Sequence, residues 1–155
     1  MGEAVLLTRT APEVMEEGMS SATLHHATPI LRVNDLAASL AYYIGPLGFK
    51  IDWQSGNFAA VSRGTCTLFL TEDAQGHGGT WLWIAVSDTE ALFAEWSESG
   101  AKIRQGPTNF PWGSLEMQVT DLDGHVLRFA SDGKKDMPYG PWMDADGRLW
   151  PMDAA

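Results

Sequence analysis

An arginine in the middle of an apolar strand pattern is the residue that most suggests chemistry. Arg128 lies in HVLRFAS, which leaves the turn signal Asp-Gly, and the segment before that turn, SLEMQVT, carries Glu116 and Gln118. Side chains two residues apart share one face of a strand, and an Asp-Gly hairpin sets the two strands side by side. Because a buried guanidinium needs a carboxylate partner, we expect Arg128 to face Glu116 and Gln118. Such a set either contacts a ligand or forms a structural ion pair.

Aromatic residues give a second indication of a binding site. Seven tryptophans in 155 residues is an unusually high number. Trp81 and Trp83 are two residues apart, so their side chains share one face of the strand, and Phe69 and Trp112 add further rings. Tryptophans fill cores, and they also stack flat ligands in pockets. We therefore expect Trp81 and Trp83 to stack a planar ligand, with Trp53 and Trp112 closing the mouth of the pocket.

The elements that position these residues form two copies of one unit. Residues 30–51 and 82–103 each contain an apolar strand, an Asp at a turn, an amphipathic helix, a glycine and then Lys-Ile. Asn34 or Asp35 caps the first helix, and Ser87 or Asp88 caps the second. Three strand patterns follow each helix, so each half reads β-α-β-β-β and the fold class is α+β.

Composition and charge exclude several functions. The formal net charge of −10, with 20 acidic and 10 basic residues, argues against nucleic acid binding and favours a cationic ligand, or else serves solubility alone. No apolar run reaches the roughly 20 residues of a membrane helix, so no membrane partner is expected. The N-terminus is a poor secretory signal, which indicates a cytoplasmic location. Cys66 is the only cysteine, so a multi-cysteine zinc site is excluded.

Histidine also gives no convincing metal or catalytic centre. The four histidines, His25, His26, His77 and His125, do not converge in the expected strands. No phosphate-binding loop, dinucleotide fingerprint or nucleophile elbow occurs. Cys66 opens a strand and is interpreted as a packed small residue. We therefore expect no cofactor.

Two motifs resemble those of the vicinal oxygen chelate superfamily, which includes glyoxalase I, the extradiol dioxygenases and the fosfomycin and bleomycin resistance proteins. ILRVNDLAASLAYYIGPLGFK is similar to the family's opening strand, helix and "LGF" element, and DLDGHVLRFA is similar to its closing hairpin, with Leu122 in place of proline. The resemblance covers roughly residues 26–131. It implies paired βαβββ modules, each a curled mixed sheet with its helix outside, that form cups around a cavity.

The resemblance also sets the expected domain limits. The domain would span 25–131, with modules 25–73 and 79–131. An extension at 1–24 is expected to be weakly ordered, and a tail at 132–155 to wrap the domain as irregular structure. In the superfamily a second chain often covers the open strand edges, sometimes with halves exchanged. We therefore expect a homodimer.

The metal-ligand positions that the resemblance implies are occupied here by Thr28, Phe69, Trp81 and Arg128. None but threonine has an oxygen or nitrogen suited to a divalent ion, and arginine would repel it. The chain therefore resembles the bleomycin resistance branch, in which a flat cationic drug is sequestered without catalysis. The expected ligand-binding residues are Thr28, Arg32, Phe69, Trp81, Trp83, Trp112, Glu116, Gln118 and Arg128, with no metal.

Two alternatives stay open at this point. The first is an enzyme of the same fold, a lyase, isomerase or dioxygenase, with Glu116 as the base or a metal at unusual positions. The second is a structural or regulatory homodimer whose cavity is filled by its own side chains. Metal analysis separates the binder from the enzyme, and ligand-induced tryptophan quenching separates the binder from the structural protein.

Overall fold

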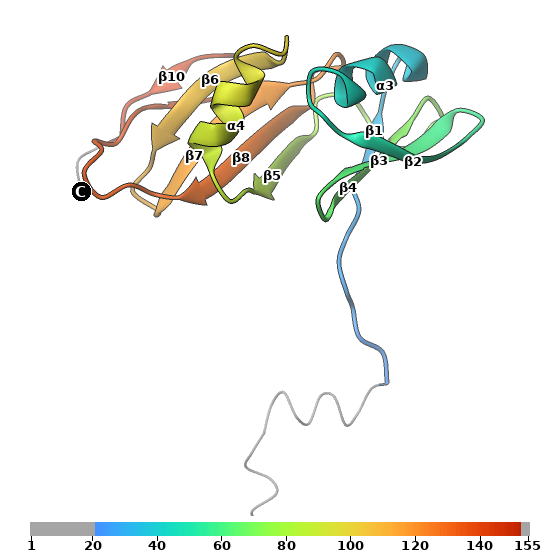
Figure 1. Ribbon diagram of the computed structural model, residues 1–155, viewed down its shortest axis with the longest axis horizontal. Coiled ribbons are helices and arrows are strands. Elements are labelled where there is room, and N and C mark those ends of the chain that lie inside the picture. Colours follow the sequence, from blue (N-terminus) through green and yellow to red (C-terminus); the bar gives the residue numbers. More distant parts are fainter. Residues whose placement is uncertain (1–20, 153–155) are drawn as a thin grey trace, which may run out of the picture.

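The computed structural model describes residues 21–152, which form two βαβββ modules and a terminal hairpin (Figure 1). The first module contains β1 (Ile30–Arg32), α3 (Leu36–Ile44), β2 (Lys50–Ser55), β3 (Phe58–Arg63) and β4 (Cys66–Thr71). The second contains β5 (Trp81–Ala85), α4 (Thr89–Trp96), β6 (Lys102–Asn109), β7 (Ser114–Thr120) and β8 (Val126–Asp132). The hairpin consists of β9 (Trp142–Met143) and β10 (Leu149–Trp150). The predicted α+β fold of paired modules is confirmed.

The two module sheets have the same topology. Their strand orders are β1-β4-β3-β2 and β5-β8-β7-β6, and in each sheet the first pair is parallel and the others antiparallel. The register fixes one row of neighbours across each sheet. The first row is Ile30–Phe69–Ala60–Trp53, and the second is Trp83–Arg128–Gln118–Gln105.

The helices begin where the sequence offers a carboxylate cap. Asp35 accepts a hydrogen bond from the backbone nitrogen of Ala38, and Asp88 accepts one from that of Ala91, both at 3.0 Å. The aspartates, rather than Asn34 and Ser87, are therefore the caps. Each helix covers one face of its sheet, and the covered faces share one core that contains Leu31, Val61, Leu70, Met117, Val119 and Leu127. The opposite face of each sheet is free to form a site.

The turn between β7 and β8 joins the modules. The Asp123 carboxylate accepts a hydrogen bond from the backbone nitrogen of Asn34 at 2.9 Å, and that of Asp121 accepts one from the Tyr43 hydroxyl at 2.8 Å. Buried His125 accepts from the Thr80 nitrogen at Nδ1, so its Nε2 carries the proton and donates to the Arg32 carbonyl at 2.7 Å. These residues therefore have a structural role at the seam.

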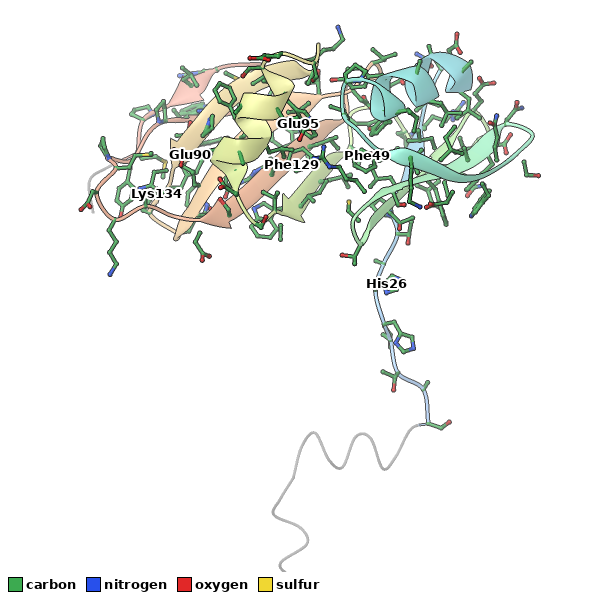
Figure 2. All side chains as sticks on the ribbon, in the orientation of Figure 1. His26, Phe49, Glu90, Glu95, Phe129 and Lys134 are labelled. Atoms are coloured by element: carbon green, nitrogen blue, oxygen red, sulfur yellow. The ribbon has the colours of Figure 1, made fainter. Side chains whose placement is uncertain are left out.

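A bidentate ion pair lies on the helix side of the same seam. The Arg63 guanidinium of β3 donates to both carboxylate oxygens of Glu95 on α4, at 2.8 and 2.9 Å, and also to the Leu47 carbonyl. Gly48, at φ +73°, passes so close that a Cβ would lie 3.0 Å from Arg63 Nη1. Figure 2 shows Glu95 in this region, with Phe49 of the first module and Phe129 of the second.

The tail differs from the expectation of irregular structure, because it contains the β9–β10 hairpin. The Asp144 side chain accepts hydrogen bonds from the backbone nitrogens of Asp146 and Arg148, and Gly147 adopts φ +83° in the turn. Trp142 and Trp150 then stack with ring centroids 6.1 Å apart. Most of the extension expected at 1–24 lies outside the described residues. Within residues 21–152 there is no helix long and apolar enough to cross a membrane.

Candidate functional site

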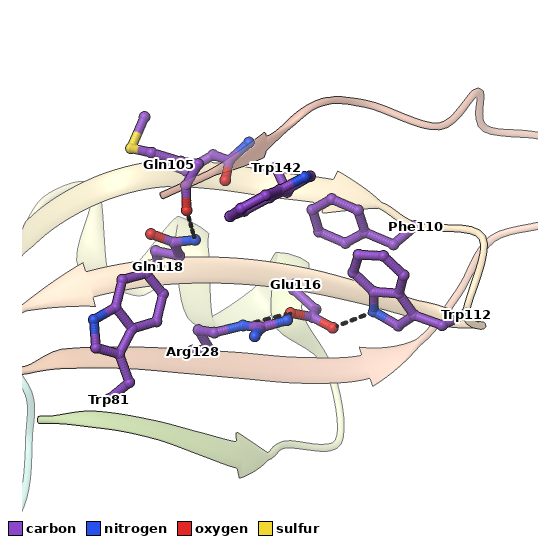
Figure 3. Close-up of a pocket in the computed structure, with 9 residues that line it drawn as sticks. Trp81, Gln105, Phe110, Trp112, Glu116, Gln118, Arg128 and Trp142 are labelled. Atoms are coloured by element: carbon purple, nitrogen blue, oxygen red, sulfur yellow. Dashed lines mark hydrogen bonds and ion pairs between the residues drawn. The ribbon is translucent and has the colours of Figure 1, made fainter. Parts of the chain in front are cut away.

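A cavity of about 200 Å³ lies on the open face of the second sheet (Figure 3). Strands β5 to β8 form its floor, the loop between β6 and β7 supplies two aromatic rings, and the hairpin supplies a wall. Four of the lining side chains are aromatic. The lining residues are Trp81, Gln105, Phe110, Trp112, Glu116, Gln118, Arg128, Trp142 and Met143.

The Glu116 carboxylate is held by every donor around it. Its Oε1 accepts from Nε and Nη2 of Arg128, at 3.0 and 2.6 Å. Its Oε2 accepts from the Trp112 indole at 2.8 Å, from the Ser114 hydroxyl, and more weakly from the Trp83 indole at 3.4 Å. The residue is only 3% exposed. Both oxygens are therefore engaged without any ligand.

These contacts decide the protonation of Glu116. Burial alone would raise the pKa of its carboxyl group. The hydrogen bonds from Ser114, Trp112 and Arg128, together with the charge of Arg128, outweigh burial and leave the pKa below its ordinary value. A general base works best with a pKa near the working pH. Glu116 instead stays ionised and its oxygens are occupied, so the geometry disfavours it as a base.

Arg128 is the free polar group of this pair. Its side chain is 32% exposed and lines the cavity, and its Nη1 has no hydrogen-bond partner among residues 21–152. Arg128 therefore neutralises Glu116 through Nε and Nη2, and the hydrogens of its Nη1 can be donated to a ligand. The expected contact with Glu116 is present, and Gln118 shares the cavity face as the cross-strand neighbour of Arg128. The side-chain hydrogen bonds of Gln118 go to other residues.

Gln118 connects the sheet to the hairpin. Its carbonyl oxygen accepts from Arg104 Nη1, and its amide nitrogen donates to the Met143 carbonyl at 3.1 Å. The Arg104 guanidinium also lies 5.6 Å from the centre of the Trp81 ring, as a cation–π contact. Arg104 thus contacts two residues of the cavity lining, Gln118 and Trp81, without lining the cavity itself.

The structure brings together five of the nine expected ligand-binding residues: Trp81, Trp112, Glu116, Gln118 and Arg128 line the cavity. Trp83 lies outside the lining, 57% exposed, although its indole points to Glu116. Thr28, Arg32 and Phe69 belong to the first module and do not line this cavity. Within one chain the four implied ligand positions are therefore not gathered in one place.

The first module has an aromatic cluster of its own. Trp53 stacks on Phe58 with ring centroids 5.7 Å apart and contacts Phe69 at 5.6 Å. Trp53 is 45% exposed, so this face is open in the single chain. The sequence suggested that Trp53 closes the mouth of the cavity, but Trp53 does not line the cavity. The residue Trp112 does lie at the cavity, stacked on Phe110 at 4.6 Å.

Sequence reasoning missed Arg104, Gln105, Phe110, Trp142 and Met143. Strand β6 has register shifts between Ile103 and Gln105 and again before Thr108, so simple alternation fails along it. The hairpin residues belong to the tail that was expected to be irregular. An Asp-Gly turn between two tryptophans was the available signal for that hairpin.

No metal centre is evident in the described part of the chain. Among residues 21–152 no group of three or more His, Cys, Asp and Glu side chains is arranged to hold an ion. Both ring nitrogens of His125 are engaged, and His26 lies on the extended segment that precedes β1 (Figure 2).

Comparisons with known proteins agree with this architecture. Residues 23–129 match the family model of the Glyoxalase/Bleomycin resistance protein/Dioxygenase superfamily. The copper(II)-bleomycin complex of the bleomycin-binding protein from bleomycin-producing Streptomyces verticillus is similar at 28% identity and a TM-score of 0.60, over 73% of this chain and 99% of that one.

Two further solved structures share the fold at lower identity. A bleomycin resistance determinant encoded on the transposon Tn5 matches at 21% identity and a TM-score of 0.62, over 70% of this chain and 98% of that one. A glyoxalase/bleomycin resistance protein/dioxygenase from Nocardioides matches at 17% identity and a TM-score of 0.61, over 81% of this chain and 95% of that one. No curated protein matches the sequence. The chain belongs to the glyoxalase/bleomycin resistance protein/dioxygenase superfamily, on the evidence of a family match over most of its length.

Proposed function

We propose that this chain is a small-molecule-binding protein that sequesters a flat, cationic ligand in the aromatic cavity of its second module, without a metal or other cofactor. One observation carries the proposal. The cavity is walled by aromatic rings, while Glu116, the carboxylate of its lining, is already saturated by hydrogen bonds. Such a site offers surface for stacking and no free acid or base.

The binding energy would come mainly from the rings. Stacking on an aromatic side chain is worth about 1–3 kcal/mol for one flat group. A cation gains further attraction from the ring faces and from the field of a chain with net charge −10. Glu116 is not the counter-ion, because Arg128 already neutralises it. The free Nη1 of Arg128 would orient the ligand by donating to a carbonyl or similar acceptor on it.

Fluorescence titration with 1-methylquinolinium, a flat cation, and with quinoline, its neutral relative, at pH 8 tests this function. We expect saturable tryptophan quenching, with tighter binding of the cation. Trp81→Ala should weaken binding by about tenfold to a hundredfold, because it removes one stack. Trp81→Phe is the matched control and should recover most of the affinity. If neither compound binds below millimolar concentration, the proposal is wrong; equal binding of both removes only the cationic preference.

The metal-free state needs its own measurement. Protein produced in metal-supplemented medium should contain no stoichiometric zinc, iron, nickel or manganese by elemental analysis. The reason is the set of side chains at the implied positions, with Thr28 and Arg128 in place of strong ligands. One tightly held ion per chain would return the enzyme alternative to first place.

We further propose a homodimer in the cytoplasm. The open aromatic face of the first module, with Trp53, Phe58 and Phe69, supports this assembly, because monomers seldom expose a contiguous apolar patch without a partner. The face would be covered by a second copy. Light scattering should give twice the 16.9 kDa chain mass, and a monomer mass at every concentration would rule the dimer out.

A further inference from the structure

We infer that the β9–β10 hairpin is a wall of the ligand cavity and limits its occupant to one aromatic ring or a fused pair of rings. The inference rests on the proposed function and adds the size class of the ligand. Trp142 and Met143 of the hairpin lie in the cavity lining, with Trp142 beside Phe110 in Figure 3. The hairpin lies outside residues 23–129, which the family model matches.

The hairpin is tied to the same sheet face that forms the cavity floor. The Gln105 side chain donates to the Pro141 carbonyl at 2.7 Å, on the residue before β9. The Gln118 side chain donates to the carbonyl of Met143, and Arg104 Nη2 donates to that of Asp144 at 2.9 Å. Three side chains of β6 and β7 thus hold three successive parts of the hairpin backbone. The wall is fixed by the floor of the site itself.

The chain before the hairpin is anchored as well. Asn109 at the end of β6 donates from its side-chain nitrogen to the carbonyls of Lys134 and Met137, both at 2.8 Å, and accepts from the Lys134 nitrogen. The Gly140 nitrogen donates to the Asn109 carbonyl at 3.0 Å. The tail therefore reaches the hairpin along a defined path over the second sheet.

The hairpin also has internal bonds that keep its shape. The second oxygen of Asp144 accepts from the Trp150 indole at 2.8 Å, in addition to the backbone bonds of the turn. The Arg148 guanidinium lies 4.0 Å from the centre of the Trp150 ring, and Trp150 stacks on Trp142. Trp142 is thus supported from behind by a second indole and a cation. A wall built in this way resists displacement by a bulky ligand.

The volume that this wall leaves sets the size of the ligand. An engineered apolar cavity of about 150 Å³ accepts benzene, and pockets for drug-sized ligands measure about 300–1,000 Å³. The cavity here, at about 200 Å³, lies between these values. A ring or fused pair therefore fits, and a multi-ring glycopeptide such as bleomycin does not fit while the hairpin is in place.

Two probes and three variants test the size limit in the full-length protein. The probes are 1-methylquinolinium, a fused pair, and copper(II)-bleomycin. Trp142→Ala removes the ring of the wall, and Asp144→Ala removes the acceptor that closes the hairpin turn. Leu149→Ala is the matched control, since Leu149 is a hairpin residue, 50% exposed, that does not line the cavity. Far-UV circular dichroism and thermal unfolding verify that each variant is folded.

The wild type and Leu149→Ala should bind 1-methylquinolinium at least tenfold more tightly than copper(II)-bleomycin. In Trp142→Ala and Asp144→Ala the affinity for 1-methylquinolinium should fall about tenfold. The dissociation constant of copper(II)-bleomycin divided by that of 1-methylquinolinium should fall at least tenfold. A ratio that stays within twofold of wild type, while the small probe still binds, overturns the size limit and leaves the proposed function standing. Failure of both probes to bind any variant overturns the proposed function itself.

Discussion

The two modules have one topology and carry different side chains on the same open face. In the first module the row across the sheet is Ile30, Phe69, Ala60 and Trp53, and in the second it is Trp83, Arg128, Gln118 and Gln105. Phe69 and Arg128 thus occupy equivalent places. The shared topology therefore determines the position of each side chain on the sheet, while the residue type at that position differs between the modules.

The difference extends to what covers each face. The polar row of the second module is bonded to the hairpin, through Gln105 and Gln118. Within residues 21–152 no tail segment hydrogen-bonds in this way to the aromatic row of the first module. One module therefore has a built cavity, and the other presents an open apolar surface. This contrast underlies the two proposals above, in which the second module binds the ligand and the first associates with a second copy.

The equivalence of Phe69 and Arg128 gives the prediction with the largest effect. Arg128→Met leaves the buried Glu116 carboxylate without its cation, and we expect the free energy of unfolding in urea to fall by about 3 kcal/mol, at the low end for a broken buried pair because Arg128 is partly exposed. Phe69→Met should cost about 1 kcal/mol, since it exchanges one partly buried apolar side chain for another.

The double variant Glu116→Gln with Arg128→Met is the control for that prediction. It removes both charges, so it should be more stable than Arg128→Met alone, with a coupling energy of about 1–3 kcal/mol. Equal destabilisation by Arg128→Met and Phe69→Met would mean that the polar row contributes no more than packing does. The distinction between the two faces would then be wrong.

The open face of the first module gives the next prediction. Trp53→Lys places a charge among Phe58 and Phe69, and we expect it to weaken the proposed dimer by at least about tenfold, because an unpaired charge is costly in an apolar interface. Trp83→Lys places a charge at an exposed position in the corresponding row of the second module, and it should change the dissociation constant of the dimer less. Sedimentation across a concentration series measures both. A dimer unchanged by Trp53→Lys would show that this face is not the interface.

The sequence predicted the modules well, and the site only in part. Strand alternation correctly placed Glu116 and Gln118 on the same face as Arg128, because β7 and β8 pair without a shift. Alternation failed on β6, where two register shifts turn Arg104 and Gln105 toward the same network.

Long-range contacts account for the rest of what sequence reasoning missed. The wall of the cavity depends on bonds from Gln105, Gln118 and Arg104 to a segment about 25 to 40 residues farther along the chain. No local pattern encodes such pairings. The number of donors around Glu116 was equally hidden, since the Trp112 indole reaches it only after the loop between β6 and β7 has folded back.

The smallest predicted effect is the part of the pH dependence of stability that comes from Glu116 in the second module. The pKa of Glu116 is lowered in the folded protein, so its ionisation contributes stability that is fully present above the unfolded pKa of about 4.3. That contribution is lost as the pH falls through the folded value. In Glu116→Gln the amide does not titrate, and the contribution is absent at every pH.

The stability advantage of the wild type over Glu116→Gln should therefore be largest at neutral pH and should shrink steadily below about pH 4. Urea unfolding of both proteins between pH 7 and pH 3 measures it. The other carboxyl groups with lowered pKa values, Asp52, Glu95 and Asp144, are present in both proteins, so their effects cancel in the difference. If the difference in unfolding free energy between the two proteins does not change with pH, the hydrogen bonds to Glu116 do not depend on its charge. The ion pair of Glu116 with Arg128 would then not distinguish the open face of the second module from that of the first.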